Sequence, residues 1–151
     1  MKTTLLASAL ISVLALTACS QAEAPRADAR AAVDMASEAA QIKTKAVLIY
    51  ADWCGSCKVL DPALQKAKMM GPMPGLEFIT LDYTAKNSTA FYAQAEAAGV
   101  GDAVKKHLNG TIKTGQLLLV DIDDSKVVGT VTKSLDADEI VSALKQAVKD
   151  S

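Results

Sequence analysis

The sequence has no surplus of basic residues and almost no histidine. Its 16 lysines and arginines are balanced by 17 acidic residues, and the basic residues form no stripe or cluster. Nucleic-acid-binding domains carry such a basic patch, so the composition argues against a nucleic-acid partner. His107 is the only histidine, and we expect it on a helix surface or in the core, without a catalytic role.

The chain also lacks the length for two domains, and it has no internal repeat. Half of its 151 residues are apolar. When an N-terminal export signal is set aside, about 130 residues remain, which is enough for one domain with a buried core. The sequence therefore predicts a single domain.

The N-terminal apolar run is too short to cross a membrane. It covers residues 5–16, whereas a membrane-spanning helix needs about 20 apolar residues. The run follows the basic Lys2 and ends at small residues before Cys19. A short basic segment, an apolar run and small residues before a cleavage site are typical of a secretory signal peptide.

The end of this segment, Leu16-Thr17-Ala18-Cys19, resembles the lipobox of bacterial lipoproteins. The resemblance implies that residues 1–18 are a lipoprotein signal peptide and that Cys19 is acylated, with palmitate among its acyl chains. Several acyl chains hold a protein on a membrane better than one. Ser20 rather than aspartate follows the cysteine, which by resemblance to enterobacterial sorting favours the outer membrane. The alternatives are an ordinary signal peptide with a chance cysteine and a buried apolar helix.

Residues 19–30 are interpreted as the lipidated cysteine followed by a flexible tether, because the segment is polar, rich in alanine and interrupted by Pro25. Residues 31–151 form the predicted domain. Apolar runs rich in β-branched and leucine residues predict strands, and apolar residues at helical spacing predict helices. In chain order the prediction is a helix over 31–43, a strand over 46–50, a helix over 57–70, a strand over 76–81, helices over 87–98 and 101–108, strands over 117–120 and 126–131, and a helix over 136–149.

This order of elements predicts an α/β fold with a central mixed sheet of about four strands flanked by helices. The last two strands are close enough in sequence to form an antiparallel hairpin. Asp136 and Glu139 have the spacing of a capping box at the start of the final helix. Pro62 falls inside the predicted helix over 57–70, where we expect a kink.

The pair Cys54 and Cys57 follows directly after a strand predicted to be buried on both faces. A cysteine at this junction lies at the N-terminus of the next helix, where the helix dipole and free amide groups favour the thiolate. The pKa of Cys54 should therefore fall below the free value of about 8.5. A thiolate there attacks a disulfide, and Cys57, one turn along and more sheltered, attacks Cys54 in turn to release the substrate.

Other uses of the two cysteines fit the sequence less well. A c-type haem site needs a histidine directly after Cys57, where Lys58 stands. A structural zinc site needs four ligands, and the two thiols with His107 are too few without a second subunit. A purely structural disulfide would close almost no loop and would stabilise little. Binding of a soft ion such as Cu(I) by a non-catalytic carrier stays open as an alternative.

The segment Trp53-Cys54-Gly55-Ser56-Cys57-Lys58, with Pro62 five residues later, resembles the active-site segment of thioredoxins. Residues 50–54 (Tyr-Ala-Asp-Trp-Cys) are more similar still to the periplasmic C-terminal domain of the reductant transporter DsbD. Residues 106–109, Asp121 and residues 135–137 also resemble that domain, so the similarity covers residues 31–149. It implies a thioredoxin-like fold in which Cys54 is the attacking thiol and Cys57 the resolving thiol, without a cofactor.

Three features depart from this family. The family has a cis-proline before the third strand, whereas Thr114 and Gly115 stand there, and the bond is expected to be trans because a non-proline cis bond costs about 3 kcal/mol. Thioredoxins bury an acid beneath the cysteines, and Leu48 takes that position. The dipeptide between the cysteines is Gly55-Ser56 rather than Gly-Pro, which should change the redox potential.

Further residues near the motif are candidates for tuning or for the substrate surface. Asp52 either tunes proton transfer or is a solvated loop acid, and Trp53 either lines the substrate surface or packs as an aromatic. Lys58 either favours the thiolate or is a solvated helix residue. The methionines at positions 69, 70 and 73 are expected to fill the core and pack the loop rather than bind a metal.

The sequence thus predicts a thiol–disulfide oxidoreductase for exported proteins, a reductase recharged by a membrane electron donor of the DsbD type. We expect the domain on the periplasmic side of a bacterial membrane, anchored through the lipid on Cys19. Two alternatives remain, the soft-metal carrier and a docking lipoprotein with vestigial activity. The intact cysteine pair argues against the last of these.

Overall fold

The structure is a computed structural model that describes residues 41–151. The predicted signal peptide, Cys19, the tether and most of the helix predicted over 31–43 lie outside the described residues. Among residues 41–151, no helix is long and apolar enough to cross a membrane.

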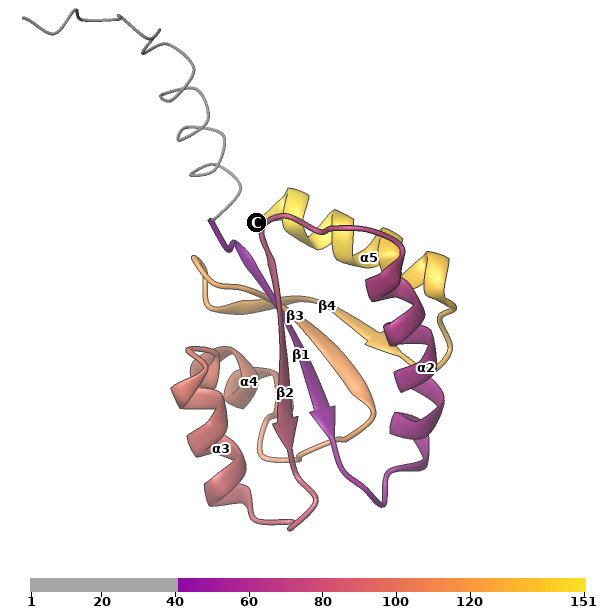
Figure 1. Cartoon of the computed structure of the whole chain (residues 1–151). Coiled ribbons are helices and arrows are strands. Elements are labelled where there is room, and N and C mark those ends of the chain that lie inside the picture. Colours follow the sequence, from indigo (N-terminus) through magenta and orange to yellow (C-terminus); the bar gives the residue numbers. More distant parts are fainter. Residues whose placement is uncertain (1–40) are drawn as a thin grey trace, which may run out of the picture.

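Four strands form one mixed sheet in the spatial order β2-β1-β3-β4 (Figure 1). Strand β1 pairs parallel with β2 and antiparallel with β3, and β3 pairs antiparallel with β4 as the predicted hairpin. The α/β class and the four-stranded mixed sheet are therefore confirmed. The strands are β1 (Thr44–Tyr50), β2 (Leu76–Asp82), β3 (Gln116–Asp121) and β4 (Lys126–Thr132).

Helices cover both faces of the sheet, so the fold has three layers (Figure 1). Helices α2 (Gly55–Met69) and α5 (Ala137–Asp150) pack on one face, and α3 (Ser88–Ala97) and α4 (Gly101–Leu108) pack on the other. Strand β1 has buried residues on both sides because successive side chains point to opposite faces. Ala46 and Leu48 contact the α2 and α5 layer, while Val47 and Ile49 contact the α3 and α4 layer.

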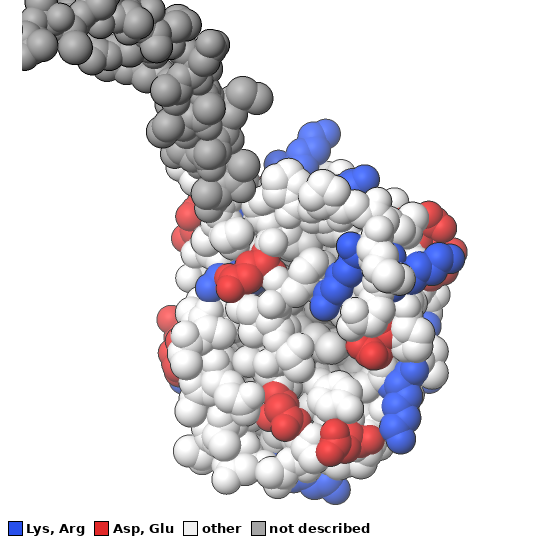
Figure 2. Space-filling view, viewed as in Figure 1, with Lys and Arg blue, Asp and Glu red and all other residues white. Residues whose placement is uncertain are grey.

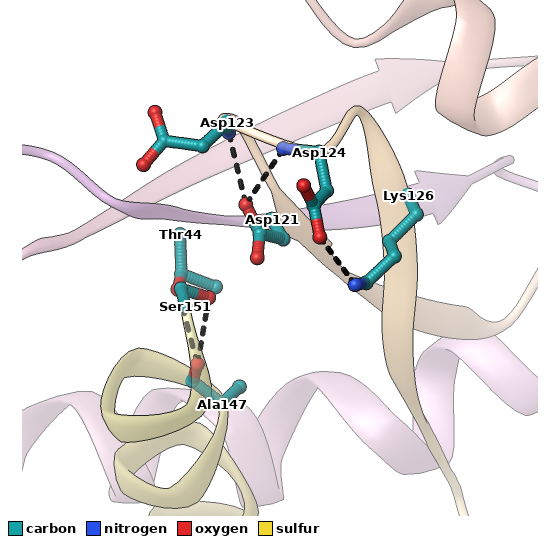
Figure 3. Close-up of polar contacts among 7 residues, drawn as sticks. All are labelled: Thr44, Asp121, Asp123, Asp124, Lys126, Ala147 and Ser151. Atoms are coloured by element: carbon teal, nitrogen blue, oxygen red, sulfur yellow. Dashed lines mark hydrogen bonds and ion pairs between the residues drawn. The ribbon is translucent and has the colours of Figure 1, made fainter.

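The predicted end of the first helix and the predicted start of the first strand are wrong by a few residues. Residues 41–43 are not helical, and β1 begins at Thr44 rather than at position 46. The polar start of this strand is buried because the Thr44 hydroxyl donates to the Ala147 carbonyl and contacts the Ser151 hydroxyl, both from the end of α5 (Figure 3). These partners are more than 100 residues away in sequence, which hides them from a local pattern.

Helix α2 begins at Gly55, two residues before the predicted start, because Cys54 serves as its N-cap. Pro62 lies inside the helix and does not end it. The helix therefore has Cys54 at its mouth and Cys57 in its first turn, one turn apart on the same side.

The same end of the sheet that holds Thr44 carries a tight turn between β3 and β4. The buried Asp121 carboxylate accepts hydrogen bonds from the backbone N–H groups of Asp123 and Asp124 (Figure 3). Lys126 forms an ion pair with Asp124 across the turn. On the face displayed in Figure 2, basic and acidic side chains are interspersed, without a patch of one sign.

The predicted capping box at the start of α5 is present and gives a test of the fold. The Asp136 carboxylate accepts from the Glu139 N–H, and the Glu139 carboxylate accepts from the Asp136 N–H, both at 2.9 Å. We expect Asp136→Ala to lower the free energy of unfolding by about 1 kcal/mol, because the first turn loses its cap. Asp136→Asn keeps an acceptor and should lose much less in a urea titration. Equal losses in the two variants would contradict this role.

Candidate functional site

The site lies where β1 ends and α2 begins. After Tyr50 the chain turns through residues 51–53, and the Cys54 N–H donates to the Ala51 carbonyl at 3.0 Å. Cys54 is extended, with φ −82° and ψ 105°, and its Sγ accepts a hydrogen bond from the Cys57 N–H at 3.1 Å. The sulfur therefore occupies the place of a capping side chain at the helix mouth.

Cys54 and Cys57 form a disulfide, with their Cα atoms 5.3 Å apart. Cys57 is 1% exposed and Cys54 is 5% exposed, and both pack against Ala51 and Tyr50. The Cys57 Sγ lies 3.8 Å from the Ile49 carbonyl oxygen, deeper beneath the sheet edge. The geometry matches the predicted order, with Cys54 at the mouth of the helix and Cys57 sheltered behind it.

The helix mouth gives this pair its chemistry. The N-terminus of a helix carries a partial positive charge of about half a unit and N–H groups without partners, and both stabilise an anionic sulfur. In the disulfide, the N–H of Cys57 is aimed at the Cys54 sulfur. The arrangement can therefore support reversible thiol–disulfide exchange.

Gly115 covers the disulfide from the loop before β3. Its φ is +79°, and its N–H donates to the Ile49 carbonyl at 2.8 Å. A Cβ atom at this position would lie 2.5 Å from the Ser56 Cβ and 3.1 Å from the Cys54 Sγ. Of the two residues predicted to replace the cis-proline, the structure places Gly115 against the sulfurs, with Thr114 half-buried just before it.

The bond before Gly115 is trans, as expected, and no peptide bond in residues 41–151 is cis. A proline could not take this backbone, because its ring holds φ near −65° and its nitrogen has no hydrogen to donate. The missing proline therefore reflects a different local backbone, fitted closely to Ser56 and the disulfide.

The position of the missing buried acid is filled by an apolar contact. Leu48 is 7% exposed and lies opposite Leu117 of β3 in the core under α2. Acidic side chains act instead on Tyr50, which packs against the two cysteines. The pKa of Tyr50 is raised above its ordinary value, first by hydrogen bonding with the Asp52 side chain and then by burial. The negative charge of Asp61, half-buried on α2, acts in the same direction.

Trp53 lies on the surface beside the disulfide, as its substrate-surface interpretation requires. Its side chain is 49% exposed, and its indole Nε1–H donates to the Thr84 carbonyl at 3.0 Å. The Lys86 Nζ lies 4.8 Å from the ring centroid, and Tyr83 packs edge-on at 6.4 Å. The ring is thus exposed but held.

The other predicted residues of the motif have less defined surroundings. Gly55 is exposed, and a Cβ atom built there meets nothing within 4 Å. Lys58 is also exposed and forms no ion pair within residues 41–151. Its backbone N–H lies 3.4 Å from the Cys54 carbonyl oxygen. Asp52 is exposed too. Its backbone N–H donates to the Thr84 hydroxyl at 3.1 Å, and its carboxylate interacts with the Tyr50 phenol.

Thr84 and Asp82 are site residues that the sequence analysis missed. Asp82 is the last residue of β2, and Thr84 follows two residues later. Strand β2 runs parallel to β1, and the carboxyl ends of neighbouring parallel strands meet at one edge of a sheet. The predicted pairing of the first two strands could therefore have drawn attention to them.

The structure places the remaining candidates away from the cysteines. His107 is exposed on α4. Met73 packs against the core, as expected for part of this group, whereas Met69 is 80% exposed and Met70 is 48% exposed, so these two do not fill the core. Within residues 41–151, no three side chains of histidine, cysteine, aspartate or glutamate gather to hold a metal ion.

Comparisons with known proteins agree with this architecture. A thioredoxin family model matches residues 32–99. Among solved structures, the chain is similar to the C-terminal domain of DsbD from Neisseria meningitidis in its reduced form, at 22% identity and a TM-score of 0.45, over 80% of this chain and 95% of that chain. It is similar to StoA from Bacillus subtilis at 13% identity and a TM-score of 0.46, over 68% and 82% of the two chains. For thioredoxin f from spinach chloroplast the values are 24% and 0.43, over 73% and 80%. No curated protein matches the sequence.

The close approach of Gly115 to the disulfide predicts a large effect of one added methyl group. Gly115→Ala should destabilise the oxidised protein through both its positive φ, about 1 to 2 kcal/mol, and overpacking, about 1 to 3 kcal/mol. Gly110 is a matched control, because its φ is +81° and a Cβ there meets nothing within 4 Å. Gly110→Ala should show the first cost alone in chemical denaturation. Similar losses in the two variants would mean that the contact with the sulfur and Ser56 is not tight.

Proposed function

Because the chain belongs to the thioredoxin-like family, we propose that it is a protein-disulfide reductase that works through Cys54 and Cys57. The observation that carries the proposal is the capping position of the Cys54 sulfur, which accepts from the Cys57 N–H at 3.1 Å and is bonded to the Cys57 sulfur. Thiol–disulfide oxidoreductase chemistry needs this pair at a helix mouth.

In the reduced protein, the Cys54 thiolate attacks one sulfur of a substrate disulfide. A bond forms between Cys54 and that sulfur, and the other substrate sulfur leaves as a thiolate. Cys57 then loses its proton and attacks the Cys54 sulfur, which re-forms the Cys54–Cys57 disulfide and releases the second substrate thiolate. Two electrons pass from the protein to the substrate, and the released thiolates take protons from water.

The proton of Cys57 must leave by the rim, because apolar Leu48 lies where a buried acid would accept it. The raised pKa of Tyr50 keeps its phenol neutral at pH 7, so it does not act as a base. The Asp52 carboxylate, which interacts with that phenol, or a water molecule beside it is the acceptor in our proposal. A membrane electron donor of the DsbD type would then return two electrons to the disulfide.

The proposed lipid anchor suits this arrangement. The described residues begin at Gln41. The seven residues of β1, Thr44–Tyr50, then cover about 23 Å at a rise of about 3.3 Å per residue and lead to the loop that carries the cysteines (Figure 1). A chain anchored through Cys19 would therefore enter the domain at the end of the sheet opposite the site. In our proposal the domain lies on the periplasmic side of the membrane, at the outer membrane by its signal, with Cys54 facing away from the lipid.

Insulin reduction tests the roles of the two cysteines. With dithiothreitol as the electron source, Cys54→Ser should abolish turnover, because no thiolate remains at the helix mouth. Cys57→Ser should also stop turnover. When this variant is reduced, freed of dithiothreitol and mixed with insulin, it should accumulate a mixed disulfide that is visible on a non-reducing gel. Cys19→Ser is the matched control and should keep full turnover. Trapping by Cys54→Ser, or turnover without Cys54, would contradict the assignment.

A copper titration of the same proteins tests the alternative that the cysteine pair is a non-catalytic Cu(I) carrier. Reduced protein is titrated with Cu(I) against a competing chelator, and the reductase proposal predicts that turnover persists in the presence of that chelator. Tight binding of one copper ion together with no insulin reduction by the metal-free protein would favour the carrier.

Lipid attachment is tested in a bacterial host by labelling with an alkyne analogue of palmitate. The unaltered chain should incorporate label and separate with the membrane fraction, because several acyl chains anchor a protein firmly. Cys19→Ala should lose both the label and the membrane association, while Ser20→Ala should keep them. Label retained by Cys19→Ala would exclude this residue as the acylation site.

A further inference from the structure

Thr84 lies at a junction between the sheet and the loop that carries Cys54. Its hydroxyl accepts from the Asp52 N–H at 3.1 Å and donates to the Asp82 carboxylate. Its carbonyl accepts from the Trp53 indole N–H at 3.0 Å, and its own N–H donates to Asp82 at 2.8 Å. One residue thus holds the two positions that directly precede the attacking cysteine.

The backbone of Asp82 is in turn hydrogen-bonded to the Gln94 side chain on α3. Gln94 accepts from the Asp82 N–H and donates to the Asp82 carbonyl, each at 3.0 Å. The hydrogen bonds from Thr84 also hold the pKa of Asp82 below its usual range, so this acceptor stays charged at neutral pH. A continuous path of hydrogen bonds therefore runs from Gln94 through Asp82 and Thr84 to the loop of Cys54.

Tyr83, the residue before Thr84, makes a second set of contacts with the same loop. The Tyr83 N–H donates to the Tyr50 carbonyl at 2.8 Å, and the Tyr83 ring packs edge-on against both Trp53 and the buried Phe91. The turn is closed by Lys86, whose N–H donates to the Tyr83 carbonyl at 3.0 Å and whose ammonium group lies over the indole ring. The indole is thus held at its nitrogen, at its edge and on one face.

We propose that Thr84 is a positioning residue for substrate binding, which acts by holding Trp53 at the rim of the disulfide. The proposal rests on the proposed reductase function for its effect on turnover. Trp53 is half-exposed, and its one polar atom is already satisfied by Thr84. It therefore offers an apolar ring to a substrate without losing side-chain entropy on binding, which is the advantage of a preorganised contact.

Thr84 should affect substrate binding and leave the chemical step at Cys54 unchanged. Neither hydroxyl bond of Thr84 reaches a cysteine, so the capping contact between Cys54 and Cys57 persists when the hydroxyl is removed. The loss should therefore appear in KM for a protein substrate and leave kcat and the reactivity of Cys54 unchanged. A defect in kcat would instead mean that the helix mouth itself had moved.

Trp53 is the only tryptophan in the chain, so its fluorescence reports on the clamp directly. In Thr84→Val, which has the same shape but no hydroxyl, we expect lower anisotropy of the indole and easier quenching by acrylamide in both oxidised and reduced protein. KM for insulin should rise about three- to tenfold, because the loop before Cys54 loses its bond to the Thr84 hydroxyl, although the Thr84 carbonyl still accepts from the indole. Thr84→Ser keeps both hydroxyl bonds and should restore both readouts.

Thr130→Val is the matched control, because Thr130 is exposed on β4 and its hydroxyl has no hydrogen bond among residues 41–151. It should change neither fluorescence nor KM. An unchanged indole signal in Thr84→Val would overturn the proposal, as would an equal rise in KM for Thr84→Ser. If the unaltered protein does not reduce insulin, the proposed function fails, and the anisotropy and quenching results still decide whether Thr84 holds Trp53.

Discussion

The site depends on the junction between the buried strand β1 and the start of helix α2. Strand β1 has core on both faces, so its end cannot shift without disturbing both layers. Helix α2 starts five residues after β1 ends, and the sulfur of Cys54 accepts from the N–H of Cys57 in the first turn of that helix. A free N–H at a helix start demands a partner. Here that demand is met by the atom that carries the chemistry, so stabilising the helix also orients the nucleophile.

Two further segments close around this junction, and each belongs to a neighbouring strand. The loop before β3 brings Gly115 onto the disulfide, and the segment after β2 brings Thr84 under the loop of Cys54. Gly115 lies against the Cys54 sulfur and the Ser56 side chain, and Thr84 holds the backbone of Asp52 and the indole of Trp53. The mixed order of the sheet explains the meeting, because β2 and β3 flank β1 and both reach the same edge (Figure 1).

The strands and helices of the described domain were predictable because their patterns are local. The run over 46–50 is apolar and β-prone, and Asp136 and Glu139 form a capping box within four residues. Features that depend on distant partners were not predictable. The start of β1 at Thr44 depends on α5, and the choice between Thr114 and Gly115 depends on backbone torsions that the sequence does not specify. The cysteine pair was readable as a motif, whereas Thr84 needed the neighbouring strand in place.

The departures from the thioredoxin pattern act on different steps of the proposed reaction. The capping contact that favours attack by Cys54 is intact. The resolving step is not helped in the same way, because Cys57 is only 1% exposed and apolar Leu48 takes the position of the family's buried acid. Attack should therefore be faster than resolution, and the mixed disulfide should last longer than in a protein with a buried acid. In the proposed reaction, a long-lived mixed disulfide would give the substrate time to settle against the exposed Trp53 ring, so the surface around the sulfurs would contribute more to selectivity than the sulfurs themselves.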